Sequence, residues 1–422
     1  MSKVKLVSVA VLCFAATCSC EFVDLRQFPD PEDAEDVVLS LEDVARVLSK
    51  LPLGDEQLQE VHDAVSSSSS NGYDEEYMLT DLLEAPGSGV GEAVTRAPLA
   101  DGGHSYTRPI RDLLKEYLDL NMSTATKAVG GMTCEKYLEA LSSSGLQIYW
   151  PESGNWDGAE MPTITWDPAD GSLVNTGFRL GEGGMEEVEV DEKYAAQHPV
   201  WVINSNDDSA FRTLQTIRRD NPEWMGEGGL LTIGSPASEN ADGQAVAKAG
   251  GAAVTRAGGD GSAPLRSLVL KSLTMKEHGD TWFCGASEYF VKIGAMESFR
   301  ASTEAELKLY NPQITDFMVV ARRKMLGEPI ECNVLLVSDW TDQLESCAFM
   351  IVEDDGGTRS SWTCEGKVMV QSKSYGFSVN LPINARDDII WRGSLSSRYF
   401  EAKRDEPVSF GTVELVFEFE EK

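Results

Sequence analysis

Positive charge is scarce in this chain of 422 residues, which carries 36 Lys and Arg against 69 Asp and Glu. The formal charge is therefore −33 at neutral pH. Contacts to phosphates supply most of the non-specific affinity for nucleic acids, so a chain this acidic is not expected to bind DNA or RNA. The same charge disfavours adsorption to an anionic lipid surface.

Histidine and patterned cysteine are also scarce, which limits the catalytic chemistry. The four histidines are far apart, and none lies in an H-E-x-x-H pattern. No Cys-x-x-Cys occurs. Residues 285–289 match the G-x-S-x-G pattern of a nucleophile elbow except at the last position, which is not glycine. The sequence therefore shows no recognisable catalytic constellation and predicts no organic cofactor.

Long hydrophobic runs are missing as well, since no segment reaches the roughly 18 apolar residues of a membrane-spanning helix. The apolar stretch 6–17 follows Lys3 and Lys5, which is the layout of a secretory signal peptide. We therefore expect residues 1–19 to be a signal peptide. Any contact of the mature chain with a membrane would then require an anchor.

The end of the leader indicates such an anchor. Thr17-Cys18-Ser19-Cys20 resembles a bacterial lipobox, in which a cysteine thiol receives diacylglycerol. We expect Cys20 to be the lipid attachment site, with Cys18 as a competing acceptor. The alternative is an ordinary cleaved leader and a freely soluble exported protein. Residues 20–39 are rich in Asp and Glu and are predicted to be an acidic tether.

Two helices are predicted directly after the tether. Ser40 can cap a helix over residues 41–50, and Asp55 can cap a second helix over residues 56–65. A run of five serines should end the second helix. We expect a helical segment over 40–84, followed by a linker rich in Gly, Pro and Ala over 85–109.

The middle region combines helical and strand patterns. Helices are expected at 110–120 and 134–141, and short strands at 147–150, 163–166, 187–190 and 200–203. We therefore predict a mixed α/β region over 110–233. Residues 234–264 contain many Gly and Ala and almost no large apolar side chains, which predicts a second linker.

The last part of the chain changes to short apolar segments with period-two alternation, as in 375–383 and 413–419. Many such segments in a short stretch favour an antiparallel β-sandwich over 265–422. The predicted fold class is therefore multidomain α+β, with an N-terminal helical segment, a mixed α/β middle region and a C-terminal β-sandwich.

One cysteine pair lies around a hairpin signal. If Asp355-Gly356 forms a two-residue turn, Cys347 and Cys364 face each other in a non-hydrogen-bonded pair, with Cα atoms about 4.5 Å apart. That separation is at the short end of disulfide geometry, and export favours oxidation. We predict a Cys347–Cys364 disulfide, with two buried thiols as the alternative.

Acidic clusters are the remaining candidates for a binding site. Asp339 with Asp342, and Glu353 with Asp354 and Asp355, could supply oxygen ligands to calcium at the ends of a β-sandwich. The competing interpretation is that these acids form turns or solvated loops. The nine tryptophans are a further candidate, because exposed indole rings could stack on sugars, although core positions are the alternative.

Four short blocks complete the sequence evidence: Asn71–Tyr77, Ile148–Pro151, Asn206–Ser209 and Leu336–Thr341. Together with the leader, they resemble a group of exported lipoproteins of Bacteroides-type bacteria. The resemblance implies a lipid-anchored protein of the cell envelope, at the outer membrane and displayed at the surface. It brings no catalytic motif.

The functional hypothesis is a non-enzymatic binding or assembly module that contacts the membrane through its lipid and binds a glycan or a protein. A surface hydrolase that acts on carbohydrate or peptide through middle-region carboxylates is the alternative. A structural subunit of a surface fibre is the third hypothesis.

Overall fold

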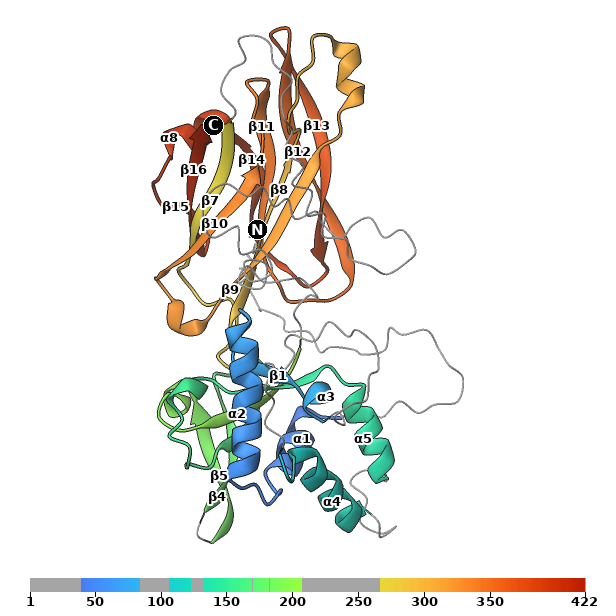
Figure 1. The fold of residues 1–422 in the computed structure, drawn as a ribbon, viewed down its shortest axis with the longest axis vertical. Coiled ribbons are helices and arrows are strands. Elements are labelled where there is room, and N and C mark those ends of the chain that lie inside the picture. The colour runs from blue at the N-terminus through green and yellow to red at the C-terminus, as the bar shows by residue number, and fades with distance from the viewer. Residues whose placement is uncertain are drawn as a thin grey trace, which may run out of the picture.

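The computed structural model describes residues 39–83, 106–122, 133–168, 170–181, 183–206 and 266–421. The predicted signal peptide, Cys18, Cys20 and nearly all of the predicted tether lie outside these residues, as do most of the first predicted linker and all of the second. The described residues are rich in strands and form two lobes along the long axis of the molecule (Figure 1). We call the part between residues 39 and 206 the N-lobe and the part between 266 and 421 the C-lobe.

The N-lobe places helices against one mixed sheet. Its elements are α1 Leu41–Leu48, α2 Asp55–Ser70, β1 Glu76–Met78, α3 Leu79–Leu82, α4 Ile110–Met122, α5 Cys134–Ser142, β2 Leu146–Tyr149, η2 Ser153–Asn155, β3 Thr163–Trp166, β4 Val174–Gly181, β5 Gly184–Asp191, α6 Glu192–Ala195 and β6 Val200–Ser205. The strand order is β1-β2-β6-β3-β4-β5, with β3 and β6 parallel. The fully buried Trp150 and Trp201 lie in the core shared by the helices and the sheet.

Local signals set the ends of the first two helices. Ser40 caps α1 as predicted, because its Oγ accepts a hydrogen bond from the Asp43 N–H at 3.1 Å. The predictions for α2 were wrong at both ends, since Gly54 is the N-cap and the serine run lies inside the helix. The helix continues because Val65 and Ser68 extend its buried face.

The C-lobe consists of two antiparallel sheets. Its elements are β7 Arg266–Met275, β8 Ser287–Ala295, η4 Glu304–Leu309, β9 Gln313–Ala321, η5 Arg323–Met325, β10 Pro329–Val337, β11 Leu344–Glu353, β12 Arg359–Val370, β13 Lys373–Asn384, β14 Asp388–Ser396, α8 Ser397–Ala402, β15 Val408–Phe410 and β16 Val413–Glu421. The strand orders are β10-β7-β16-β15 and β13-β12-β11-β8-β9. Both sheets contribute to one core, where the Phe349 and Phe417 ring centroids are 5.9 Å apart.

Strand β11 changes its partner along its length. It pairs with β12 only at Leu344 and Ser346, and with β14 from Ser346 to Glu353. The β12–β13 ribbon therefore covers the other face of the sheet, where Val379 belongs to a second buried cluster with Met350. A Cβ atom on Gly294 would collide with Val379, so the ribbon can lie this close only over a glycine.

This branching corrects the predicted disulfide, because both Cys347 and Cys364 are free thiols. Residues 354–358 connect β11 to β12, so Asp355-Gly356 is not a two-residue turn and the register differs from the predicted one. Cys347 instead faces Leu395 of β14, and its Sγ donates to the Leu395 carbonyl at 3.5 Å. The two cysteines belong to different hydrophobic clusters.

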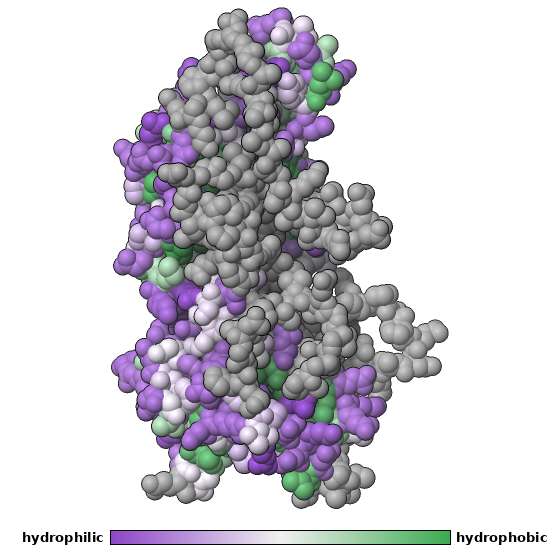
Figure 2. Space-filling view, viewed as in Figure 1, coloured by the Kyte–Doolittle hydropathy of each residue, from purple (hydrophilic) through white to green (hydrophobic). Residues whose placement is uncertain are grey.

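The visible described surface is mainly hydrophilic, with small separate apolar patches (Figure 2). Three exposed apolar side chains, Val174, Leu180 and Met185, lie on the β4–β5 hairpin. None of the described helices is long and apolar enough to cross a membrane.

Candidate cation site at the lobe junction

The loop between β7 and β8 joins the lobes. Trp282 and Phe283 in this loop are buried in a hydrophobic cluster with Tyr149 of the N-lobe sheet. The Trp282 Nε1–H donates to the Leu173 carbonyl at 2.9 Å, and the Asn204 amide donates to the Phe283 carbonyl at 3.0 Å. Both loop aromatics are therefore held by packing and by a hydrogen bond to the opposite lobe.

Two arginines that follow β9 hold the junction from the C-lobe side. Arg322 Nη2 donates to the Ser69 carbonyl at 2.6 Å and to the Tyr73 carbonyl at 2.8 Å, at the C-terminal end of α2. Arg323 donates to the Asp280 carbonyl at 3.0 Å and to the Glu192 carboxylate at 2.8 Å. These bonds fix the β7–β8 loop beside the N-lobe.

Three carboxylates converge next to this loop. Asp280 belongs to the loop, Glu353 ends β11, and Asp355 lies in the connection to β12. One oxygen from each residue lies within 4.8 Å of the others. Glu353 is buried, and Asp280 and Asp355 are half-buried. A Cβ atom on Gly279 would lie 2.8 Å from Glu353 Oε1, so this position leaves room for the cluster.

The electrostatics of the cluster favour a bound positive charge. Burial raises the pKa of Asp280 and the Asp388 charge raises it further, whereas a hydrogen bond with Glu353 and the Arg323 charge lower it. A hydrogen bond between two carboxyl groups requires a proton on one of them. Burial also raises the pKa of Asp167 to about 6, with the Asp280 charge as a further cause. A cation could replace the shared proton and relieve the repulsion among these acids.

The predicted site residues are divided between the two ends of β11. Asp355 belongs to the cluster, whereas Asp354 Oδ1 beside it accepts hydrogen bonds from the Gly356 N–H at 3.2 Å and the Asn384 amide at 2.9 Å. Asp354 thus acts as a turn former. Asp339 and Asp342 lie beyond the opposite end of this ten-residue strand, roughly 30 Å away.

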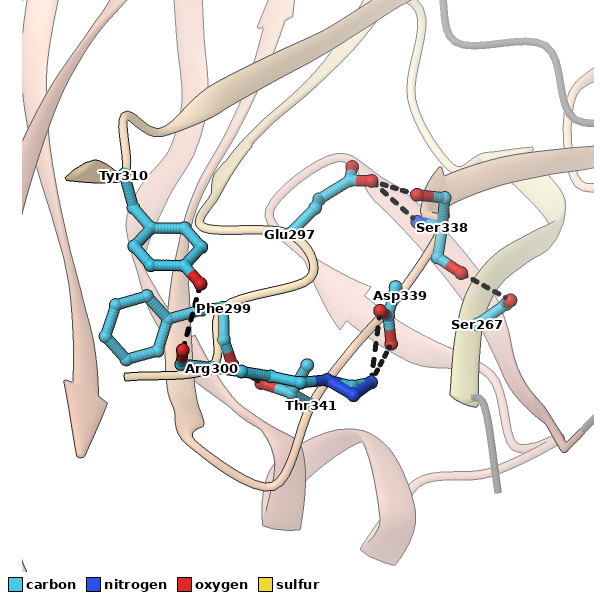
Figure 3. Close-up of polar contacts among 8 residues, drawn as sticks. All are labelled: Ser267, Glu297, Phe299, Arg300, Tyr310, Ser338, Asp339 and Thr341. Carbon is cyan, nitrogen blue, oxygen red and sulfur yellow. Dashed lines mark hydrogen bonds and ion pairs between the residues drawn. The ribbon is translucent and has the colours of Figure 1, made fainter. Parts of the chain in front are cut away.

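Figure 3 shows the polar contacts around Asp339. Its carboxylate pairs with the Arg300 guanidinium at 3.3 Å. Glu297 accepts a hydrogen bond from the Ser338 N–H at 3.2 Å, and Thr341 donates to the Phe299 carbonyl at 2.8 Å. Residues 338–341, which follow β10, are therefore held by hydrogen bonds and Asp339 has a counter-ion, whereas Asp342 is exposed. Among the described residues, Asp339 and Asp342 join no group of three metal-ligating side chains, and a calcium site there stays a prediction.

The tryptophans are mostly core residues. Trp150, Trp201, Trp282 and Trp340 are fully buried and cannot stack on a sugar. Trp362 is 40% exposed, but the Arg392 guanidinium lies 3.5 Å from the centre of its ring and covers one face.

A shallow hollow on the N-lobe contains none of the predicted site residues. It has a volume of about 400 Å³ and lies on the β4–β5 hairpin. Its lining residues are Val174, Asn175, Thr176, Glu187, Val188 and Glu189.

Sequence reasoning singled out Glu353 and Asp355 but missed Asp280. The reason is separation, because Asp280 is more than 70 positions from the other two ligands and follows a different strand. The local signal was confined to the run Glu353-Asp354-Asp355. Comparison of the chain with protein-family models, with curated proteins and with solved structures found no match.

Proposed function

We propose that this protein is an exported, lipid-anchored binding or assembly module of the cell envelope, at the outer membrane. The leader and its cysteine motif support the anchor. The two-lobe architecture supports a binding role, because the lobes are joined by a specific junction that can present surfaces in a fixed relation. The proposed partners are the membrane, through the lipid, and a glycan or protein ligand.

The anchor is tested by metabolic labelling with a radioactive fatty acid in the native host. Cys20→Ser should abolish labelling, and Cys18→Ser should leave it intact. Labelling that survives Cys20→Ser but is lost in Cys18→Ser would move the attachment site to Cys18.

We further propose that the junction cluster of Asp280, Glu353 and Asp355 binds calcium. The convergence of three carboxylates within 4.8 Å carries this proposal. Calcium prefers six to eight oxygen ligands, so main-chain carbonyls and water would complete the shell. Because one ligand comes from the β7–β8 loop and two from β11 and its connection, the ion would stiffen the loop that joins the lobes.

A thermal melt in excess calcium and then in chelator tests this site. At about 100 times the dissociation constant, a ligand adds about 2.7 kcal/mol, which corresponds to a shift of several degrees. Asp280→Asn combined with Asp355→Asn should remove the shift. The matched control is Asp339→Asn with Asp342→Asn, which should keep it. Equal melting of the wild-type protein in both solutions would contradict the proposal.

We also propose that the C-lobe is a β-sandwich. The support is the single core to which both antiparallel sheets contribute. The helical segment of the N-lobe is proposed as one unit with its sheet, because α1, α2, α4 and α5 share a core with β2 and β6.

A surface hydrolase remains the second candidate, and Asp167 is the observation that favours it. This middle-region carboxyl has a pKa raised to about 6 by burial and by Asp280 and Asp170, which suits a general acid near neutral pH. Asp167→Asn should abolish hydrolysis of envelope polysaccharides or peptides, whereas the exposed neighbour variant Asp170→Asn should not. Absence of hydrolysis by the wild-type protein across both substrate classes would remove this candidate.

A further inference from the structure

Asp74 is a buried acid at the lobe junction that the candidate cation site does not use. It lies between α2 and β1 and is 3% exposed. Its Oδ2 atom has no hydrogen-bond partner among the described residues. The same atom faces Gly285 of the β7–β8 loop, where a Cβ atom would lie only 3.0 Å from it. Gly285 has a φ of +102°, a conformation that L side chains rarely adopt.

The charges around Asp74 would stabilise its ionised carboxylate only weakly. Arg322 Nε lies 3.9 Å from Asp74 Oδ1, but the donors of this guanidinium are directed to the Ser69 and Tyr73 carbonyls. Burial and the charges of Glu76 and Glu75 raise the pKa of Asp74, whereas a hydrogen bond from the Glu75 N–H and the Arg322 charge lower it by less.

The other titratable groups near Asp74 add no compensating cation. Tyr149 packs from β2 and carries no charge near neutral pH, because burial raises its pKa. Lys324 pairs with Glu75 at 3.6 Å, and Arg323 pairs with Glu192. Cys284, next to Gly285, contacts Thr281.

We propose that the lobe junction is a proton-dependent latch, closed while Asp74 is neutral and loosened when Asp74 ionises. A neutral carboxyl can remain in this dry position at a modest cost, whereas a carboxylate requires donors or water. We expect the β7–β8 loop to respond, because Gly285 in that loop lies against the Oδ2 atom of Asp74, which is unpartnered within the described part of the chain. Burial raises the pKa of Asp74 to about 7, so the change would occur near neutral pH.

The direction of the effect follows from this pKa. Since the folded value of about 7 lies above the ordinary value of 3.8, Asp74 stabilises the docked state fully below about pH 4. That contribution is lost as the pH rises toward 7. Between about pH 4 and pH 7, the ratio of open to docked junction should rise by up to about tenfold for each pH unit, and above pH 7 it should level off.

Hydrogen exchange read by mass spectrometry tests the latch in the full chain, at about pH 5.5 and about pH 8.5. Chelator is present throughout, so that failure of the calcium proposal cannot affect the result. After correction for intrinsic exchange rates, amides of residues 276–286 should lose protection at the higher pH, while β2 and β6 keep theirs. Acidification should restore the protection.

Two variants separate Asp74 from other buried acids. Asp74→Asn should keep the loop equally protected at both pH values. If this variant does not fold, Asp74→Ala replaces it, with the same expected result. Glu60→Gln is the matched control, because Glu60 is another buried N-lobe carboxyl whose pKa is raised to about 7. It should retain the wild-type response of the loop. Equal protection of the wild-type loop at both pH values, or an unchanged response in the Asp74 variants, would overturn the latch.

Discussion

Two buried acids, one in each lobe, are stabilised by different kinds of partner. In the C-lobe, Lys292 of β8 and Asp316 of β9 face each other in register, and Lys292 Nζ lies 3.0 and 2.8 Å from the two carboxylate oxygens. In the N-lobe, the buried Glu60 carboxylate accepts a hydrogen bond from the Ile110 N–H at 2.7 Å, and no ion pair to it is found within the described part of the chain. These two buried acids are thus stabilised differently, Asp316 by a cation and Glu60 by a main-chain donor.

This difference predicts which part of the molecule should change its stability with pH. Burial raises the pKa of Asp316, and the charge of Lys292 lowers it. A carboxylate held by one main-chain donor has its pKa raised by burial to about 7, as in Glu60. We therefore expect the N-lobe and the junction to respond to pH near neutrality, and the C-lobe to respond less.

Breaking the C-lobe pair should have the largest effect. Lys292→Met leaves Asp316 buried without its cation, and removal of one partner of a buried pair typically costs about 3–5 kcal/mol. Urea unfolding should show this loss in the transition of the C-lobe. The control is Lys292→Met with Asp316→Leu, which removes both charges and should recover most of the stability. A single variant as stable as the wild-type protein would mean that the pair is not truly desolvated.

Removing the uncompensated N-lobe charge should give a smaller effect of opposite sign. Glu60→Gln should stabilise the protein at about pH 8 by roughly 2–3 kcal/mol and change little at about pH 4.5. The sign follows because a carboxyl whose pKa is raised to about 7 gives stability that is lost as the pH rises. Unfolding curves at both pH values measure the difference. A uniform loss of stability at both pH values would contradict the prediction, because it would show that Glu60 acts through a contact that does not depend on its charge.

The smallest effect is expected at a site with no buried charge. Ser40→Ala removes the side-chain cap of α1 and should cost about 1 kcal/mol. Thr133→Ala, at the cap of α5, is a parallel case, since Thr133 Oγ1 accepts from the Lys136 N–H at 3.3 Å. Both losses should be independent of pH between about 5 and 8, in contrast to Glu60→Gln. A pH-dependent loss at Ser40 would place α1 within the same ionisable network.

The features that the sequence predicted well are local. Ser40 and Thr133 cap helices because each cap needs only a side chain and an amide three residues ahead. The strands around residues 147–150, 163–166, 187–190 and 200–203 are present as β2, β3, β5 and β6. Strand β4 was missed because it contains Asn175 and Gly177, which have low strand propensity. Gly177 fits there because a Cβ atom would lie 2.6 Å from both Thr163 and Val190.

The features that could not be predicted depend on contacts between distant segments. The Cys347–Cys364 prediction assumed that two neighbouring strands stay paired along their whole length, whereas β14 displaces β12 after Ser346. Asp280 reaches Glu353 and Asp355 only because the β7–β8 loop folds back over the end of β11. No pattern within a short window encodes either arrangement.

The branching of β11 also bears on how this chain can vary. Between Ala348 and Glu353 the strand is paired on both edges, with β8 and β14, and its two faces belong to different cores. A single inserted or deleted residue would exchange its buried faces and shift two registers together. The β12–β13 turn at Gln371 and Ser372 lies outside both cores, with exposed side chains and one side-chain contact, from Gln371 to the Ser302 carbonyl at 2.7 Å. Insertions and deletions in related sequences are therefore expected at the β12–β13 turn and not within β11.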